Sequence, residues 1–346
     1  MAESRKNRVV LGLMTFGPNK AWGAKTTSLD EYGRFLDYFQ SMGYDEVDTA
    51  RMYQHGEQEG FTAQVGWKKR NLKLATKLYP VKGGMHSPKN LREAVETSLR
   101  ELQTDSVDTF YLHAADRSTP FAESLKEVNE LYNEGKFRQF GISNFTSFEV
   151  AEVVMTCHAN GWVRPTVFQA MYNAFTRGME AELVPALRRY GIDILVYNGL
   201  AGGLFTGKYN AKNTEASGEL THVDKTYRAR YLRDAPLEAL SLVEPIVQKH
   251  GLTLVETAIR WLIHHSALNM RSKGGNDGIL TGASSLEQFK TTLPQFDKGP
   301  LPQEVVKALD DGWKISKAQA ADYWHLDLAY TYDTTKVLFG YSIDDH

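Results

Sequence analysis

Short apolar runs alternate with amphipathic stretches along almost the whole chain. Runs of this length are typical of buried strands, and apolar residues that recur every three or four positions are typical of helices. The predicted strands are residues 9–14, 46–47, 72–77, 107–113, 137–143, 167–171, 192–197 and 279–282. The predicted helices are residues 28–41, 57–66, 88–102, 120–133, 147–160, 179–190, 237–250 and 254–265, and a last one that begins at Ser285.

The pattern amounts to eight strand–helix units without a reversal, which predicts a closed parallel (β/α)8 barrel, or TIM barrel. An open, doubly wound sheet is the alternative, but residues 12–17 lack the G-x-G-x-x-G spacing of such a sheet's first turn. An extra helix over residues 303–321 and an aromatic tail follow the eighth unit. The sequence contains no linker, so residues 1–346 are expected to form one domain.

One long polar segment, residues 208–233, interrupts the alternation after the seventh strand. Long insertions in compact domains commonly serve a function, and many close over a bound ligand. We therefore expect a lid in this segment.

Composition narrows the class of protein. At 42% hydrophobic and 24% charged, the chain has ample material for a core, and a net charge of −2 gives no reason to expect nucleic acid or an anionic membrane as a partner. No apolar run is long enough to span a bilayer, and the N-terminus lacks a signal-peptide core. The single cysteine, Cys157, excludes an intrachain disulfide and fits the cytoplasm. No histidines have metal-ligand spacing, which argues against a metal-dependent hydrolase.

Four reactive side chains stand at or near predicted strand ends: Asp48, Tyr53, Lys77 and His113. In a parallel barrel these ends meet at one face. A buried lysine needs a partner, which Asp48 would supply, and an ammonium near a phenol would lower the pKa of Tyr53 from about 10 and make it a general acid. Each residue also has an ordinary structural explanation. Asp48 could cap a helix and Tyr53 could be a half-buried aromatic residue in a turn. Lys77 could extend its charge to solvent at the strand end, and His113 could be a hydrogen-bonded histidine of the core. Their occurrence together favours chemistry.

The motifs Asp48-Thr-Ala-x-x-Tyr53, Ala75-Thr-Lys77 and Tyr111-Leu-His113 resemble the catalytic tetrad of the aldo-keto reductases. Residues 107–114, 134–137, 172–174 and 200–209 further resemble the branch of the aflatoxin-aldehyde and succinic-semialdehyde reductases. The resemblance implies a (β/α)8 barrel that reduces small aldehydes and ketones with NADPH. It also implies that Tyr53 donates the proton, that Lys77 and Asp48 adjust the acidity of Tyr53, and that His113 helps to hold the substrate carbonyl.

The same family leaves a second function open, because the potassium-channel β-subunits keep the barrel and the tetrad and act mainly by binding a partner. Such a protein would be a cofactor-sensing regulatory subunit. The family branch also suggests a homodimer, although no interface is visible in the sequence.

A cofactor site is expected at the later strands. Ser143, Asn144 and Gln169 carry the donors and acceptors that a nicotinamide carboxamide needs, and Tyr197 offers a face on which the ring can stack. By resemblance the site also includes Met14, Asn198, Leu200, Gly202, Lys208, Arg230, Gly282, Ser284, Ser285 and Gln288. Lys208 would face the pyrophosphate, and the helix start at Ser285 suits a 2′-phosphate. A plain helix cap is the alternative for Ser143-Asn144 and for Ser285.

The substrate pocket is expected to have an apolar, aromatic mouth with a basic group. The residues assigned to it are Phe16, Trp22, Met52, Arg228, Tyr323 and Trp324. Arg228 would bind a substrate carboxylate or a cofactor phosphate. The alternatives are that the aromatic residues belong to the core and that Arg228 lies on a solvated face.

Overall fold

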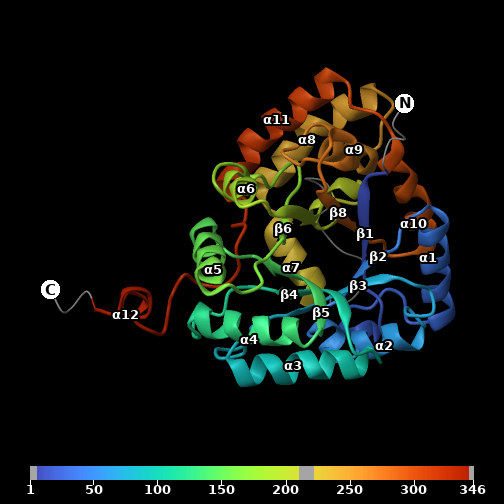
Figure 1. Ribbon diagram of the computed structural model, residues 1–346. Helices are drawn as coiled ribbons and strands as arrows, with labels where there is room; N and C mark the ends of the chain where they lie inside the picture. Colours follow the sequence, from blue (N-terminus) through green and yellow to red (C-terminus); the bar gives the residue numbers. More distant parts are fainter. Residues whose placement is uncertain (1–5, 210–221, 343–346) are drawn as a thin grey trace.

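Eight parallel strands close into a barrel in sequence order (Figure 1). The structure is a computed structural model and describes residues 6–209 and 222–342. The strands are β1 (Arg8–Gly12), β2 (Glu46–Asp48), β3 (Lys73–Leu78), β4 (Val107–Leu112), β5 (Phe137–Ser143), β6 (Val167–Met171), β7 (Asp193–Tyr197) and β8 (Gly278–Thr281). Pairing of β8 with β1, in the register Val9 to Ile279, closes the ring. The predicted (β/α)8 fold is therefore confirmed.

Most of the helices surround the strands and cover the outside of the barrel (Figure 1). They are α1 (Leu29–Ser41), α2 (Gln58–Gln64), α3 (Pro88–Glu101), α4 (Phe121–Asn133), α5 (Ser147–Asn160), α6 (Leu183–Arg189), α7 (His222–Tyr231), α8 (Asp234–Lys249), α9 (Leu254–His264), α10 (Leu286–Thr292), α11 (Gln303–Ser316) and α12 (Thr334–Phe339).

Two helix predictions differ from the structure by more than small shifts of one to three residues at their ends. Residues 179–190 divide into a 3-10 turn, Gly178–Glu180, and α6, while the extra helix ends at Ser316 and is followed by a short 3-10 turn, Lys317–Gln319. Within the segment predicted to be a lid, residues 210–221 lie outside the described part of the chain, and α7 occupies most of the remainder.

Local capping signals explain where several helices begin. The side chain of Ser28 accepts from the backbone N–H of Glu31 at the start of α1. At the start of α5, Thr146 and Glu149 cap each other's backbone N–H groups in a capping box. Proline is the first residue of α3, where its missing N–H removes no helical bond.

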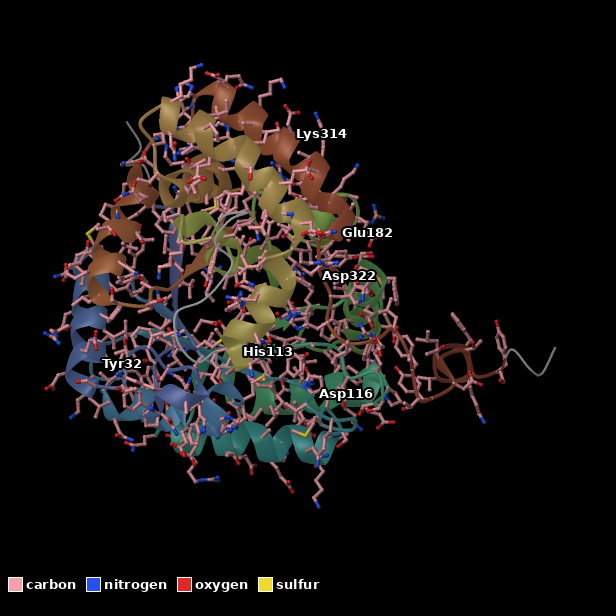
Figure 2. The ribbon with its side chains drawn as sticks, turned by 180° about the vertical axis from the view of Figure 1, so that it is seen from behind. Tyr32, His113, Asp116, Glu182, Lys314 and Asp322 are labelled. Carbon is pink, nitrogen blue, oxygen red and sulfur yellow. The ribbon has the colours of Figure 1, made fainter. Side chains whose placement is uncertain are left out.

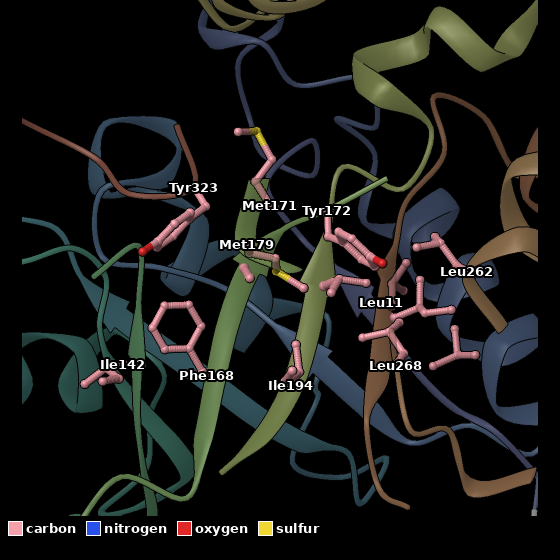
Figure 3. Packing of buried hydrophobic residues seen from close by; sticks show 14 of the residues in the cluster. Leu11, Ile142, Phe168, Met171, Tyr172, Met179, Ile194, Leu262, Leu268 and Tyr323 are labelled. Atoms are coloured by element: carbon pink, nitrogen blue, oxygen red, sulfur yellow. The ribbon is translucent and has the colours of Figure 1, made fainter. Parts of the chain in front are cut away.

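In several strands the side chains alternate between two apolar clusters. In β1, Val9 and Leu11 face the large cluster between strands and helices, whereas Val10 faces a small cluster inside the barrel. Figure 3 shows part of the large cluster around β5, β6 and β7. Inside the barrel the packing is tight, because a Cβ on Gly141 would lie 2.4 Å from the ring of Tyr111. The interior is thus filled, and space for a ligand must lie at an end of the barrel.

The chain continues beyond α11 as a tail that first crosses the body and then leaves it. Tyr330 donates to Glu149 Oε1 at 2.7 Å, and the backbone N–H of Thr331 donates to the carbonyl of Arg117 at 3.1 Å. Farther on, α12 projects away from the barrel on the side of α4 and α5 (Figure 1). Its apolar side chains, including Phe339, are exposed.

Cys157 is fully buried in α5 as part of the core. Burial raises the pKa of its thiol to about 12. Among the helices of the described residues, none combines the length and the apolar character needed to cross a membrane.

Candidate active site

The C-terminal ends of β2, β3 and β4 bring three of the expected side chains to one face of the barrel. Asp48 is the last residue of β2, Lys77 is the penultimate residue of β3, and His113 follows β4 directly. Strand pairing places Asp48 opposite Ala75 and Lys77 opposite Tyr111, so the three positions are neighbours across adjacent strands. His113 and Asp116, both from the loop that leaves β4, are labelled in Figure 2.

Asp48 and Lys77 form a buried ion pair. Lys77 Nζ donates to Asp48 Oδ2 at 2.5 Å and to the carbonyl of Thr49 at 2.6 Å, and Gln169 Nε2 donates to the other carboxylate oxygen at 3.1 Å. Burial raises the pKa of Asp48 and lowers that of Lys77, and the attraction between the two charges opposes both shifts. The partnership expected from the sequence is confirmed. Together the two groups form a site with little net charge.

Tyr53 lies beside this pair at the start of a short turn, Tyr53–Gly56. The turn contains two consecutive residues with left-handed backbones, Gln54 and His55, which is a strained arrangement for non-glycine residues. The side chain of Gln54 stabilises it by donating to the carbonyls of Met14, at 3.2 Å, and Trp22, at 3.3 Å. The loops after β1 and β2 therefore fix the position of the phenol jointly.

The phenol of Tyr53 lies close to both Lys77 and His113. Lys77 Nζ is 5.2 Å from the centre of the Tyr53 ring, and the ring centre of His113 is 6.0 Å away. The prediction that Lys77 lowers the pKa of Tyr53 is wrong: burial raises this pKa, and the carboxylate of Asp48 raises it further. Any attraction between the ammonium of Lys77 and the phenolate therefore does not outweigh burial and the repulsion from Asp48. Tyr53 is therefore in its protonated form throughout the neutral pH range.

His113 is held as a neutral imidazole. Burial lowers its pKa well below 6.5, and the nearby Lys77 and His325 lower it further. Its Nδ1 atom is buried, with no hydrogen-bond partner among residues 6–209 and 222–342. A neutral imidazole beside a protonated phenol can present a donor to a carbonyl oxygen without adding charge to the site.

The side chains expected to hold a nicotinamide also come together. Asn144 Nδ2 donates to the carbonyl of His113 at 2.8 Å and to Ser143 Oγ at 2.9 Å, and Asn144 Oδ1 accepts from Tyr197 at 2.7 Å. Gln169 lies in the next strand and contacts Asp48. Nδ2 of Asn198 is buried without a hydrogen-bond partner in the described part of the chain. A carboxamide, which both donates and accepts, fits this set if it replaces Tyr197 at Asn144.

Other expected cofactor residues follow β1 and β7. Met14 and Leu200 are half-buried in these loops. Gly202 has φ +59°, and a Cβ there would lie 2.7 Å from the ring of Tyr231, so this glycine permits close packing of α7. Lys208 is exposed. Arg230, on α7, has Nη1 3.8 Å from the sulfur of Met171 and no carboxylate within ion-pair distance in the described residues.

The residues expected at a 2′-phosphate lie at the start of α10. Ser285 is the N-cap and accepts from the N–H of Gln288 at 3.3 Å, while the Gln288 side chain accepts from the N–H of Ser284 at 3.3 Å. Gly282 could carry a Cβ without a clash, since that atom would lie 3.8 Å from the carbonyl oxygen of Gly12. Helix capping therefore uses these groups in the structure, and their role toward a phosphate stays a prediction.

Two of the expected pocket residues belong to the core instead. Phe16 is fully buried, with its ring centre 4.5 Å from that of Tyr32 and 5.0 Å from that of Phe35. Tyr323 is buried as well: its hydroxyl donates to Glu182 and accepts from the N–H of Ser147 at 3.2 Å. Figure 3 shows its ring among buried side chains near Phe168. Both rings thus pack in the core cluster, as the alternative expected, and their contact with a substrate stays a prediction.

The other expected pocket residues are less enclosed. Met52 is 43% exposed in the loop after β2, and Trp22 is half-buried with its ring 4.9 Å from His55. Trp324 packs edge-on against Tyr323, at 5.0 Å, and Arg228 is half-buried on α7. Their contact with a substrate stays a prediction.

Sequence reasoning missed two residues of this region, Tyr79 and His325. The ring of Tyr79 is 5.3 Å from that of His113 and 6.0 Å from that of His325. His325 Nε2 is 3.3 Å from Arg230 Nη2 and 3.4 Å from the hydroxyl of Tyr197. Tyr79 stands two positions after Lys77, and His325 directly follows Trp324. Their closeness in sequence to Lys77 and Trp324 was the signal that could have identified them.

Comparison with known proteins identifies the family. The model of the Aldo/keto reductase family matches residues 8–314. The chain belongs to this family. Like other aldo/keto reductases, it is an oxidoreductase. Its described residues contain no group of three or more side chains suited to a metal ion.

Several relatives match the aldo/keto reductase along most of its length. It is 40% identical over 297 residues to an aldo-keto reductase of Pseudocercospora fijiensis, which covers 84% of this chain and 99% of the relative. It is 39% identical over 328 residues to aflatoxin B1 aldehyde reductase member 2 of Mus musculus, and the match covers 91% of this chain and 87% of the relative. Aldo-keto reductase pigE of Monascus ruber is 37% identical over 334 residues, with 92% and 97% covered.

Proposed function

We propose that this aldo/keto reductase reduces aldehydes and ketones with NADPH, through Tyr53, Lys77, Asp48 and His113. The observation that carries the proposal is the convergence of these four side chains at the C-terminal mouth of the barrel, with a protonated phenol between an ammonium and a neutral imidazole. The names of several relatives, which include aflatoxin B1 aldehyde reductases, support an aldehyde as substrate.

In this proposal Tyr53 donates its proton to the carbonyl oxygen as negative charge develops there. The raised pKa keeps the phenol protonated at neutral pH, which is the form that reduction requires. An alkoxide is a stronger base than a phenolate, so the proton transfer remains favourable despite the raised pKa. Oxidation of an alcohol would require the phenolate and is disfavoured near neutrality for the same reason.

The other three residues position and stabilise this proton transfer. His113, as a neutral imidazole, orients the carbonyl next to the phenol. Lys77 stabilises the phenolate that remains after proton transfer, from 5.2 Å above its ring. Asp48 holds Lys77 in place through the bond of 2.5 Å.

The dinucleotide would be held by residues at the ends of β5 to β7. Ser143, Asn144 and Gln169 bind the carboxamide, Tyr197 supplies the stacking face, and the unpartnered Nδ2 of Asn198 supplies a further donor. When bound, the cofactor supplies the hydride that no side chain can provide. Arg230, Lys208 and the Ser284–Gln288 segment are proposed for its phosphates, with preference for NADPH over NADH.

The test replaces Tyr53 with phenylalanine. We expect Tyr53→Phe to lower kcat for 4-nitrobenzaldehyde by about 100-fold or more, as loss of a general acid does, with the Kd for NADPH within twofold of the parent protein. Tyr32→Phe is the matched control, because it removes a buried tyrosine hydroxyl that bonds Thr62 and, in the described residues, none of the four reactive side chains; it should leave kcat unchanged.

Three outcomes would contradict the proposal in different ways. Full activity of Tyr53→Phe would exclude Tyr53 as the proton donor. Tighter binding of NADH than of NADPH would exclude the cofactor preference. Tight binding of NADPH without turnover of any carbonyl in a broad panel would favour a cofactor-sensing regulatory subunit.

A further inference from the structure

Arg117, in the loop after β4, holds the C-terminal tail by three consecutive carbonyl groups. Its Nη1 donates to the carbonyls of His325, at 2.9 Å, Leu326, at 3.4 Å, and Asp327, at 3.2 Å. The other edge of the guanidinium binds Glu149 in a bidentate pair, with distances of 2.7 Å from Nε and 3.0 Å from Nη2. These side chains are only 3% and 0% exposed.

Glu149 is itself fixed on α5. Its Oε2 accepts from the N–H of Thr146 at 2.8 Å, as part of the capping box that begins the helix. Its Oε1 also accepts from the hydroxyl of Tyr330 at 2.7 Å, and the carbonyl of Arg117 accepts from the N–H of Thr331. The Arg117–Glu149 pair thus binds the tail at two places, directly after His325 and again at residues 330–331.

His325 enters the candidate active site at the near end of this anchored segment. Its backbone N–H donates to the carbonyl of Asn144 at 3.2 Å, and the next residue, Leu326, has φ +65°, so the chain turns away immediately. The imidazole continues a row of ring contacts from Tyr53 through His113 and Tyr79. His325 is therefore the residue through which the tail reaches the reactive groups.

The hydrogen bonds of His325 define its protonation state. Arg230 can only donate, so Nε2 of His325, at 3.3 Å from its Nη2, must be an acceptor, and the ring proton lies on Nδ1. The hydroxyl of Tyr197 gives its proton to Asn144 and cannot compete. Burial and, to a smaller extent, the nearby Arg230 together lower the pKa of His325 to about 4. The tail therefore contributes a neutral imidazole, whose Nε2 accepts from Arg230 and so orients this arginine at the mouth of the barrel.

We propose that Arg117, paired with Glu149, is a positioning residue for the carbonyl pocket, and that it acts by holding His325 in place as a wall of that pocket. The proposal rests on the proposed reductase function. Two buried charges stabilise a fold no better than well-packed apolar side chains would. The pair instead determines the path of the tail, because the guanidinium binds three successive carbonyls and the first of them belongs to His325.

A double-mutant cycle tests the proposal. We expect Arg117→Ala and His325→Ala each to raise KM for 4-nitrobenzaldehyde about fivefold or more, measured at saturating NADPH. If Arg117 acts through His325, Arg117→Ala should raise KM less than twofold further in a protein that already carries His325→Ala. Full additivity of the two effects would overturn the proposal.

Arg177→Ala is the matched control for loss of a buried arginine. Arg177 donates to the carbonyl of Ala174 at 2.9 Å and to Asp310 at 2.7 Å, and none of its hydrogen bonds in the described chain goes to residues 325–331. It should lower Tm without changing KM. An equal rise of KM in Arg177→Ala would show that Arg117 matters only for stability, and would overturn the proposal.

Two further measurements keep the proposal testable if Arg117→Ala folds poorly or if no carbonyl is turned over. Tyr330→Phe removes only the hydroxyl bond to Glu149 and should raise KM about twofold. NMR titration of the His325 ring does not need activity: its pKa should rise from about 4 toward the ordinary value in Tyr330→Phe and more so in Arg117→Ala, as the ring leaves Arg230. An unchanged titration in both variants would overturn the positioning role, whereas a shift without turnover would contradict the reductase function alone.

Discussion

Replacing Lys77 with methionine should damage both stability and catalysis. The change leaves the carboxylate of Asp48 without its cation, at a place where the two side chains are 0% and 2% exposed. Breaking a buried pair in this way costs about 3–5 kcal/mol. With an unfolding entropy of about 2.1 cal/mol/K per residue, a chain of 346 residues has about 0.7 kcal/mol/K, so Tm should fall by about 4–7 °C.

The stability loss should depend on pH in a defined direction. Without Lys77, burial is opposed only by the smaller effects of the Gln169 hydrogen bond and Arg8, so it raises the folded pKa of Asp48 above the unfolded value of about 3.9. Such a group favours folding most when it is protonated, below the unfolded pKa, and this contribution is lost as the pH rises through the folded pKa. The difference in Tm between Lys77→Met and the parent protein should therefore be larger at pH 8 than at pH 5. Adding Asp48→Asn should recover much of the loss.

The assay combines thermal unfolding with steady-state reduction of 4-nitrobenzaldehyde. We expect kcat of Lys77→Met to fall by about 100-fold or more, within the range for loss of assisted proton transfer. Arg8→Met is the matched control, since Arg8 and Glu46 form a partly buried pair at 2.6 Å at the opposite end of the barrel. It should lower Tm and leave kcat within twofold. A kcat within tenfold of the parent for Lys77→Met, or an equal loss in Arg8→Met, would refute this reasoning.

Three further predictions follow from the site. Phe16→Ala should cost about 3–5 kcal/mol of stability, measured by thermal unfolding, with KM unchanged. A severalfold rise in KM would indicate instead that the Phe16 ring contacts the substrate. Tyr197→Phe keeps the stacking face and frees Asn144 Oδ1, so the Kd for NADPH from fluorescence quenching should be equal or lower, and a higher Kd would contradict the proposed exchange. Because the pKa of His113 lies well below 6.5, kcat/KM should be flat from pH 6 to 8. An inflection there that His113→Gln removes would count against a neutral imidazole.

Much of the barrel could be predicted because its local signals agree with its packing. The bounds predicted for β5, β6 and α5 are those of the structure, since apolar runs and a capping box mark them clearly. The helix predicted at residues 179–190 was too long, because apolar spacing does not distinguish a 3-10 turn from the start of an α-helix.

The site could be predicted only where strand ends decide it. Asp48, Lys77 and His113 meet because the ends of parallel strands share one face. The side to which Phe16 turns depends on packing with α1, which the sequence does not specify. The pKa of Tyr53 depends on its burial and on the repulsion from Asp48, and the place of His325 depends on a hydrogen bond to Arg117 that spans 208 positions. Such distant contacts leave no periodic signal.

The burial of Cys157 has a practical consequence. A thiol with a pKa of about 12, enclosed within α5, reacts slowly with maleimides and iodoacetamides at neutral pH. A second cysteine introduced on an exposed side chain of α12, such as Phe339→Cys, would then be the preferred point of attachment for a fluorophore or a spin label. A label can therefore be placed on α12 without first removing the chain's own cysteine.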